Sequence, residues 1–308
     1  MTQADGRVRY TGPDWARFGE GDRRGALNYI SAQTIIAAAK CVRSGEVFPL
    51  NQPMELRPPE RTGRMTLRKH SRVHNHQVPI DGGRHLVIND DYVEFDLQGS
   101  SQLDSLAHFG LLEPGSDAVF YGGAGLDEVG PGSVARSLGI DAFGGAIVTR
   151  GVLVDVTKVL PAENGYLQPD QVIDSDALER ALHQQGSQLE RGDALLIYVG
   201  QETRCKGQGK HPESSPGIDG SCLDLLRGHE ISLVASDNLG VEIVPELPDF
   251  SAHVGALRNL GIPLGELWAL RALAQACVRD SRYEFLLASV PLNITGAIGS
   301  PANAVAIR

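Results

Sequence analysis

Short apolar runs alternate with a helix-like segment in the second half of the chain. Residues 151–156 (GVLVDV), 194–199 (ALLIYV) and 231–236 (ISLVAS) have the length and composition of buried strands. Residues 175–185 (SDALERALHQQ) have the apolar spacing of an amphipathic helix that stops at Gly186. Buried strands that alternate with helices predict an α/β domain built around a mixed sheet.

The amino-terminal half contains one clear helix and several extended stretches. Residues 31–43 (SAQTIIAAAKCVR) begin with a serine in capping position, show helical spacing and are followed by Gly45. Residues 47–50 begin an extended stretch. Residues 92–97 (YVEFDL) alternate strictly and predict a half-buried strand, with Val93, Phe95 and Leu97 facing the core. So many extended stretches argue against a doubly wound fold.

A polar segment, residues 98–108 (QGSSQLDSLAH), follows this predicted strand directly. If the strand stays regular, Gln98, Gln102 and Asp104 project from its polar side. His108 lies four residues after Asp104, so both side chains reach the same point if a helix starts at Ser105. A single Gln, Asp or His at a strand end is commonly a cap, but this grouping on one face favours a functional site.

This segment resembles the signature of the cyclase family of metal-dependent hydrolases, which includes bacterial kynurenine formamidase and isatin hydrolase. The family pattern is His-x-Gly-Thr-His-x-Asp-x-Pro-x-His, and the chain aligns with it in register through Gln98, Ser100, Ser101, Gln102, Asp104, Leu106 and His108. Both early histidines are glutamines and the proline is leucine, whereas the Asp-x-x-x-His end matches. A larger branch of the family is similar in having glutamine there. Residues 19–27, 236–242, 253–266, 283–286 and 291–296 resemble that branch as well.

The resemblance implies one domain over residues 1–308 with the swivelling β/β/α arrangement of the family. It also implies that His253 and Glu266 lie at metal-site positions, together with Asp104 and Gln102. Gln102 would bind through its carbonyl oxygen, a weaker donor than imidazole. Because two imidazoles are replaced by amides, we expect one zinc or manganese ion and not a pair of zinc ions.

Such a site suits hydrolysis, since a divalent cation lowers the pKa of its water from 15.7 toward about 7. The prediction is a metal-dependent hydrolase of a cyclic or aryl amide, imide or lactone, acting through a metal-activated water on carbon–nitrogen bonds other than peptide bonds. His108 is the candidate for proton transfer, with a role as metal ligand as the alternative. A metal-assisted cyclase that closes a ring and a non-catalytic ligand-binding relative are the other two functions considered.

Several further residues are candidates for substrate contact or for support of the metal ligands. Gln98 lies at the start of the signature segment, and Ser101 could hydrogen-bond a ligand side chain or act as a nucleophile. Asp237 follows the strand predicted at 231–236, where it either supports a site or stabilises a turn. His74 and His76 lie among basic residues and predict a loop that contacts an anionic or polar substrate, or a solvated loop.

The composition of the chain limits the classes of partner that it can bind. The formal net charge is −10, which argues against a nucleic-acid partner. No apolar run approaches the length of a membrane span, the first ten residues lack the apolar core of a signal peptide, and the four cysteines form no C-x-x-C pair. We therefore expect a cytoplasmic protein that takes a small-molecule substrate and contacts no membrane. The resemblance implies a homo-oligomer.

Overall fold

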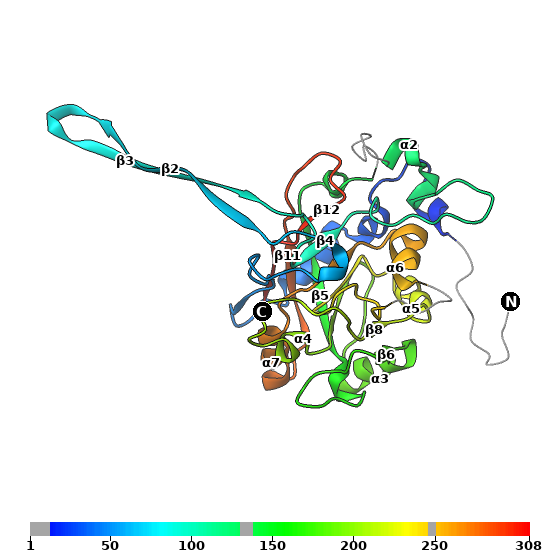
Figure 1. The fold of residues 1–308 in the computed structure, drawn as a ribbon. Helices are drawn as coiled ribbons and strands as arrows, with labels where there is room; N and C mark the ends of the chain where they lie inside the picture. The colour runs from blue at the N-terminus through cyan, green and yellow to red at the C-terminus, as the bar shows by residue number, and fades with distance from the viewer. Residues whose placement is uncertain (1–12, 130–137, 246–250) are drawn as a thin grey trace.

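Nine strands form one mixed sheet at the centre of the molecule (Figure 1). The computed structural model describes residues 13–129, 138–245 and 251–308, and the strand order is β1-β13-β11-β5-β7-β9-β10-β4-β12. The strands from β5 to β10 pair in parallel, and those at both ends of the sheet pair antiparallel. The strands are β1 (Val47–Pro49), β4 (Gln102–Asp104), β5 (Ile147–Asp155), β7 (Ala194–Tyr198), β9 (Leu233–Ser236), β10 (Leu264–Glu266), β11 (Glu284–Ser289), β12 (Gly299–Pro301) and β13 (Ala304–Ile307). The α/β class with a mixed sheet is confirmed.

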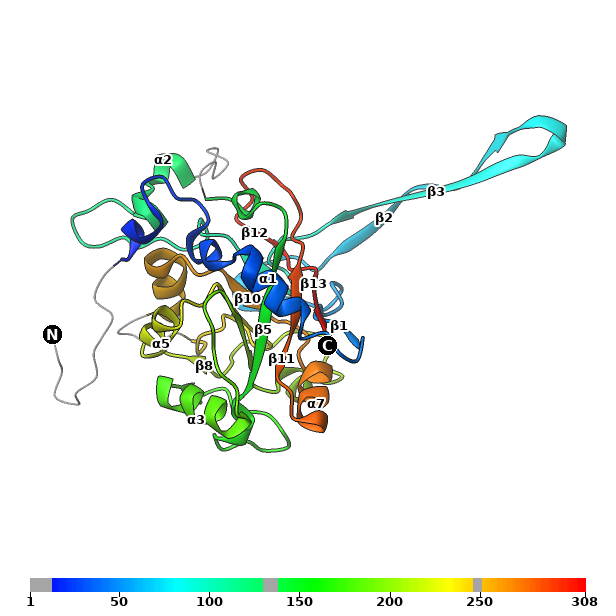
Figure 2. The same cartoon turned by 180° about the vertical axis from the view of Figure 1, so that it is seen from behind.

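Helices pack on this sheet, and two smaller strand pairs lie outside it. Helix α1 packs on β5 and β11 on the side turned to the viewer in Figure 2, while α3 and α7 also contact β5. The smaller pairs are β2 (Arg68–Pro79) with β3 (His85–Glu94), and β6 (Val172–Ile173) with β8 (Gly217–Ile218). The helices are α1 (Ala32–Ala39), α2 (Leu126–Val129), α3 (Ser175–Gln185), α4 (Gln201–Arg204), α5 (Cys222–Gly228), α6 (Ala252–Val254), which continues into a π-helical turn at Gly255–Leu260, and α7 (Arg271–Asp280).

Local capping explains where the two predicted helices begin and end. The Asp174 carboxylate accepts a hydrogen bond from the Ala177 amide, and Gly186 ends α3 with a left-handed φ of 69°. Ser31 and Thr34 form a capping box at the start of α1. Helix α1 ends at Ala39, earlier than the predicted 31–43, and the chain turns after it.

The three predicted buried strands are confirmed as β5, β7 and β9. Every residue of β7 and β9 is buried. Other strands flank these strands within the sheet, and neither face of β7 or β9 is exposed, which is why their sequences are continuous apolar runs without alternation. The core of the molecule is therefore centred on the parallel part of the sheet.

The prediction for residues 92–97 is wrong about the environment of the strand. Strand β3 ends at Glu94, every residue in it is exposed, and Val93 retains 47% of its accessible surface. Strands β2 and β3 form a long hairpin that projects from the body (Figure 1). An alternating sequence gives a strand whether or not a core covers one of its faces. Phe95 and Leu97, which follow the hairpin, are half-buried, and Leu97 packs against the core.

Candidate metal centre

Strands β4 and β10 bring three of the predicted site residues onto one face of the sheet. The two strands pair antiparallel, and Glu266 lies directly opposite Gln102. Directly opposed residues point to the same side of a sheet, and so do residues two apart on one strand. Gln102, Asp104 and Glu266 therefore share a face, and all three are buried.

His253, from α6, and His108 complete a cluster around the Asp104 carboxylate. His253 Nε2 lies 3.7 Å from Asp104 Oδ2 and 3.8 Å from Glu266 Oε1. His108 Nε2 lies 3.8 Å from Asp104 Oδ1. The expected helix after Ser105 is absent; a turn takes its place, in which the His108 amide donates to the Ser105 carbonyl. This turn still brings His108 back to Asp104.

The hydrogen bonds of His253 leave its Nε2 facing the carboxylates. Its Nδ1 lies 3.1 Å from the Gly240 carbonyl oxygen, which can only accept, so Nδ1 carries the proton. The Glu242 carboxylate accepts hydrogen bonds from the His253 backbone amide and the Ser251 hydroxyl. In the neutral ring the lone pair of Nε2 therefore faces the carboxylates and is available to a cation, while Gly240 and Glu242 hold the ring and backbone of His253 in place.

Two atoms of the cluster lack a hydrogen-bond partner among the described residues. These are Asp104 Oδ2 and His253 Nε2, both buried. A buried carboxylate oxygen without a partner costs folding free energy, which a bound cation would recover. Ligands of one zinc ion lie about 2 Å from it, so two of them are at most about 4 Å apart, and the separations above satisfy this. Asp104, His108 and His253 also have one possible ligand atom each, and these three atoms lie within 4.8 Å of one another, somewhat more than this limit. The donors fit a divalent cation.

Burial and charge shift the pKa values of the cluster in opposite directions. Burial lowers the pKa of His253, but the neighbouring carboxylates of Asp104 and Glu266 outweigh this and raise the pKa to about 9. Burial, together with the charge of Asp104, raises the pKa of Glu266 to about 7. For Asp104, burial raises the pKa, but the two histidines lower it further than burial raises it. Burial lowers the pKa of His108. The raised pKa values of His253 and Glu266 mean that protons compensate the carboxylate charge in this closed site, and a bound cation would take over that role.

The other residues of the signature segment support this cluster or the strands around it. The Gln98 side chain lies 3.4 Å from His108 Nδ1, and the Gln102 amide nitrogen lies 3.4 Å from Asp104 Oδ1. The side-chain oxygen of Gln102 accepts a hydrogen bond from the Arg64 guanidinium group. Ser101 lies outside the cluster: its hydroxyl donates to the Leu267 carbonyl and accepts from the Gln52 amide, which ties β4 to the chain after β10.

Asp237, His74 and His76 are placed apart from the cluster. The Asp237 carboxylate accepts hydrogen bonds from the backbone amides of Val199 and Gln201, and it lines a cavity of about 270 Å³. His74 and His76 lie on β2, in the projecting hairpin, so the loop predicted around them is a strand (Figure 1).

Of three further residues that shape the site, sequence reasoning missed Arg64 and Phe109, and it considered Glu242 only as a residue after the strand 231–236 that could support a site or a turn. Arg64 donates to the Gln98 carbonyl and to Gln102, and no motif surrounds it. Glu242, which holds His253, lies in a segment that resembles the family. The ring of Phe109 lies 4.3 Å from that of His253, centroid to centroid, and its place directly after His108 was the available signal.

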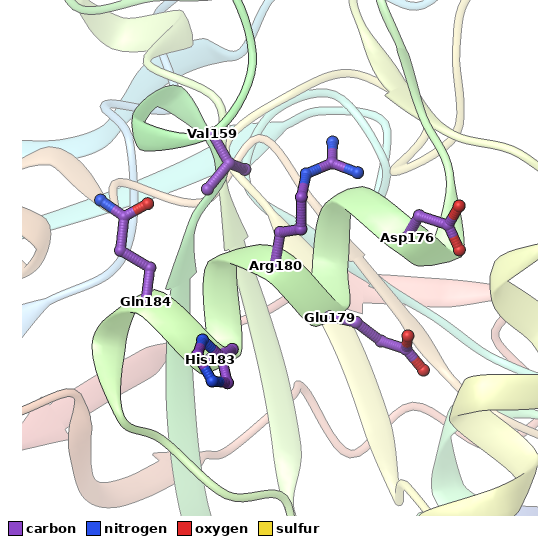
Figure 3. Close-up of a pocket in the computed structure, with 6 residues that line it drawn as sticks. All are labelled: Val159, Asp176, Glu179, Arg180, His183 and Gln184. Atoms are coloured by element: carbon purple, nitrogen blue, oxygen red, sulfur yellow. The ribbon is translucent and has the colours of Figure 1, made fainter.

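The broad hollow beside α3 has no residue in common with the metal centre (Figure 3). It has a volume of about 710 Å³ and is lined by Val159, Asp176, Glu179, Arg180, His183 and Gln184. The opposite face of α3 carries its buried residues. The hollow therefore follows the solvated face of an amphipathic helix.

Comparison with known proteins agrees with the fold. Residues 35–243 match a family model described as "Putative cyclase". A crystal structure described as a novel cyclase is 30% identical with a TM-score of 0.84, over 98% of this chain and 100% of that one. An isatin hydrolase bound to the product analogue thioisatinate is 16% identical with a TM-score of 0.57, over 90% and 98% of the two chains. Isatin hydrolase A from Labrenzia aggregata, bound to benzyl benzoate, has 16% identity, a TM-score of 0.56 and the same coverage.

None of the curated proteins compared with the sequence matches it. In the described part of the chain, no helix has the length and apolar character needed to cross a bilayer. The family match covers more than half of the chain, and the similarity to the novel cyclase extends over nearly all of it. This chain belongs to the cyclase family and has its fold.

Proposed function

We propose that this protein is a metal-dependent hydrolase of a cyclic or aryl amide, imide or lactone. The observation that carries the proposal is the pair of buried, unpartnered atoms Asp104 Oδ2 and His253 Nε2, 3.7 Å apart, with Glu266 beside them. Similar folds include proteins described as isatin hydrolases, which supports hydrolysis over other chemistry.

Asp104, Glu266 and His253 would hold one divalent ion, manganese or zinc. Gln102 is the fourth proposed ligand, because it shares their face of the sheet. Its side-chain oxygen, the atom that would bind, accepts from Arg64, and its amide nitrogen faces Asp104, so the amide would have to turn to reach the ion. Two carboxylates and one neutral imidazole suit either metal. When bound, such an ion acts as a Lewis acid that polarises a carbonyl group and makes water more acidic.

His108 would transfer the proton between the attacking water and the leaving nitrogen or oxygen. Its side chain retains 16% of its accessible surface, against 0–5% for Asp104, His253 and Glu266. It is therefore the member of this cluster that a substrate can reach. Gln98, on the other side of the ring, would hold the imidazole in orientation.

Hydrolysis of a substrate panel tests this function. Enzyme loaded with manganese or zinc is offered formanilides, isatins, imides and lactones, and at least one class should be hydrolysed. Asp104→Ala should abolish turnover and lose the metal, whereas Asp117→Ala, which removes an exposed carboxylate, should change neither. An Asp104→Ala variant that binds the cation at full occupancy would remove Asp104 from the metal ligands.

Ring closure by a metal-assisted cyclase is the second candidate, because the relative at 30% identity is described as a cyclase. The same metal would then assist dehydration or an aldol-type step. Turnover of open-chain precursors without hydrolysis of the panel would favour it. Ligand binding that is indifferent to a chelator, without turnover, would instead indicate a non-catalytic relative.

A cytoplasmic location fits this function. All four cysteines are free thiols in the structure, as expected for a protein of a reducing compartment. The substrate is proposed to be a small molecule, since the site is buried and the overall charge is negative.

A further inference from the structure

Arg64 lies in the loop that leads into the β2–β3 hairpin, and its backbone is fixed on both sides. The Arg64 amide donates to the Thr62 hydroxyl, and the amide of the next residue, Met65, donates to the Asp96 carboxylate. The Arg64 side chain is half-buried. Its guanidinium group therefore starts from a fixed backbone, unlike that of a solvated surface arginine.

One nitrogen, Nη1, makes all the hydrogen bonds that this guanidinium group forms with described residues. Nη1 donates to the backbone carbonyl of Gln98 at 2.7 Å and to the side-chain oxygen of Gln102 at 3.3 Å. These bonds hold the group beside the metal centre. Its charge contributes to the pKa values of Asp104, His108 and Glu266, although burial is the largest single influence on each.

The other edge of the Arg64 guanidinium group, formed by Nε and Nη2, has no partner in the part of the chain that the structure describes. Neither nitrogen is among the buried atoms that lack a hydrogen bond, so both are open to solvent. An arginine that is partly removed from water is usually paired with an anion. The described residues supply no anion to this edge, so a ligand can supply one.

The Nε–Nη2 edge of an arginine binds a carboxylate group through two parallel hydrogen bonds. Arg150 shows this arrangement in the same protein, since its Nε and Nη2 donate to the two oxygens of Asp193 at 2.9 and 2.7 Å. A phosphate group carries up to two negative charges, and here it would lie near the carboxylates of Asp104 and Glu266. A carboxylate, with a single charge, is the anion that one arginine can balance.

We propose that Arg64 anchors a carboxylate group of the substrate beside the metal centre. This inference rests on the proposed hydrolase function and narrows its substrates to amides, imides or lactones that carry a carboxylate. The carboxylate would accept hydrogen bonds from Nε and Nη2, while Nη1 keeps its bond to the Gln98 carbonyl. A substrate held at one end presents its reacting carbonyl to the cluster in few orientations, which favours reaction.

Calorimetric titration with benzoate tests the anchor without any turnover. Metal-loaded wild-type protein should bind benzoate, and neutral benzamide should bind at least about tenfold more weakly, because it lacks the charge that strengthens the two hydrogen bonds. Arg64→Gln should raise the dissociation constant for benzoate at least about tenfold for the same reason. Arg43→Gln, which removes an exposed arginine outside the site, is the matched control and should bind as the wild type does.

Two results of this titration would overturn the proposal. One is a wild-type protein that does not bind benzoate at millimolar concentration. The other is an Arg64→Gln variant with the wild-type affinity, because the carboxylate would then bind to the metal ion or elsewhere.

Arg64→Lys separates the two parallel hydrogen bonds from the charge. Lysine keeps the positive charge but has a single ammonium group in place of the planar edge. Its affinity for benzoate should therefore lie between those of the wild type and Arg64→Gln. Metal content and melting temperature show whether the cluster is intact in each variant. If Arg64→Gln loses its metal, Arg64→Lys decides the question, and an unchanged affinity in that variant overturns the two-bond anchor.

Two formanilides, one with a carboxylate on its ring and one without, distinguish this inference from the proposed function. Arg64→Gln should raise KM for the carboxylated compound at least about tenfold and leave KM for plain formanilide unchanged. Equal effects on both compounds would make Arg64 a residue that only positions Gln98 and Gln102, which overturns the anchor. If no compound of the panel is hydrolysed while benzoate binding depends on Arg64, the hydrolase function fails and the carboxylate anchor is supported.

Discussion

His108 and His253 both contact the carboxylate of Asp104, but water reaches them to different extents. The His253 side chain is 4% exposed and has its Nδ1 proton on a backbone carbonyl. The His108 side chain is 16% exposed, and its Nδ1 lies 3.4 Å from the side-chain nitrogen of Gln98. A fixed, buried imidazole suits a metal ligand, and a reachable one suits proton transfer.

His108→Ala should keep its metal and lose turnover by about 10²–10⁴-fold, the usual contribution of one acid–base group. The measurement is metal content by mass spectrometry beside kcat for the best substrate of the panel. His183→Ala, which removes an exposed histidine from α3, serves as control. A metal-free His108→Ala protein would make His108 a ligand.

His211 should make the protein less stable as the pH falls. Burial lowers the pKa of His211 to about 4, below the value of about 6.5 in an unfolded chain. Between these values the unfolded chain binds a proton that the folded protein does not, so the free energy of unfolding decreases from pH 6.5 toward pH 4, in total by about 3 kcal/mol. Urea unfolding at several pH values measures this slope.

His211→Gln should flatten that slope, because glutamine does not titrate. It retains a polar group for Ser100, whose hydroxyl lies 3.3 Å from His211 Nε2. A variant whose stability depends on pH as steeply as the wild type in this range would assign the effect to other groups.

At the scale of elements, close contact between neighbouring strands depends on a glycine in β5. Gly151 lies opposite Phe285 of β11, and a Cβ at position 151 would come within 2.2 Å of the Phe285 ring. The aromatic ring occupies the space that a side chain would need.

Gly151→Ala should therefore destabilise the fold by about 1–3 kcal/mol, the usual cost of overpacking a core. Gly228→Ala is the matched control, since a Cβ there meets nothing within 4 Å and the residue ends α5. It should be neutral or stabilising by up to about 1 kcal/mol. Denaturant midpoints of the two variants measure the difference, and equal midpoints would contradict the packing argument.

At the scale of the whole molecule, the metal centre connects parts of the chain that are distant in sequence. Asp104 comes from β4, Glu266 from β10 and His253 from α6. A cation bound to all three would hold these elements together in the folded state only, and so it should stabilise the fold as a whole.

Manganese or zinc should bind at one equivalent per chain and raise the melting temperature. At a free concentration one hundred times the dissociation constant, the gain is about 2.7 kcal/mol. Calorimetric titration gives the stoichiometry, and thermal unfolding with and without a chelator gives the stabilisation. Two equivalents per chain would contradict the single-ion site, and an unchanged melting temperature would contradict metal binding to the folded state.

The sequence alone determined the elements whose signals are local. The Asp174 cap and Gly186 lie next to the helix they bound, so α3 was predicted at the residues where it forms. Continuous apolar runs revealed β5, β7 and β9 because burial on both faces leaves no polar position. Asp104 and His108 were also predicted to meet, since they lie only four positions apart. The place of His253 and Glu266 at this site was expected only from the resemblance to the family.

Only the tertiary structure decided what these segments face. Residues 92–94 alternate as a half-buried strand would, yet they lie in the exposed β2–β3 hairpin. An alternating sequence does not specify which surface, if any, covers the apolar face of the strand. His74 and His76 lie on β2 of the same hairpin, which projects away from the body that carries the metal centre. The meeting of Asp104 with Glu266 and His253, and the support from Arg64 and Glu242, depend on the pairing of β4 with β10 and on chain packing. Contacts between residues far apart in sequence leave no local pattern, so folding alone brings them together.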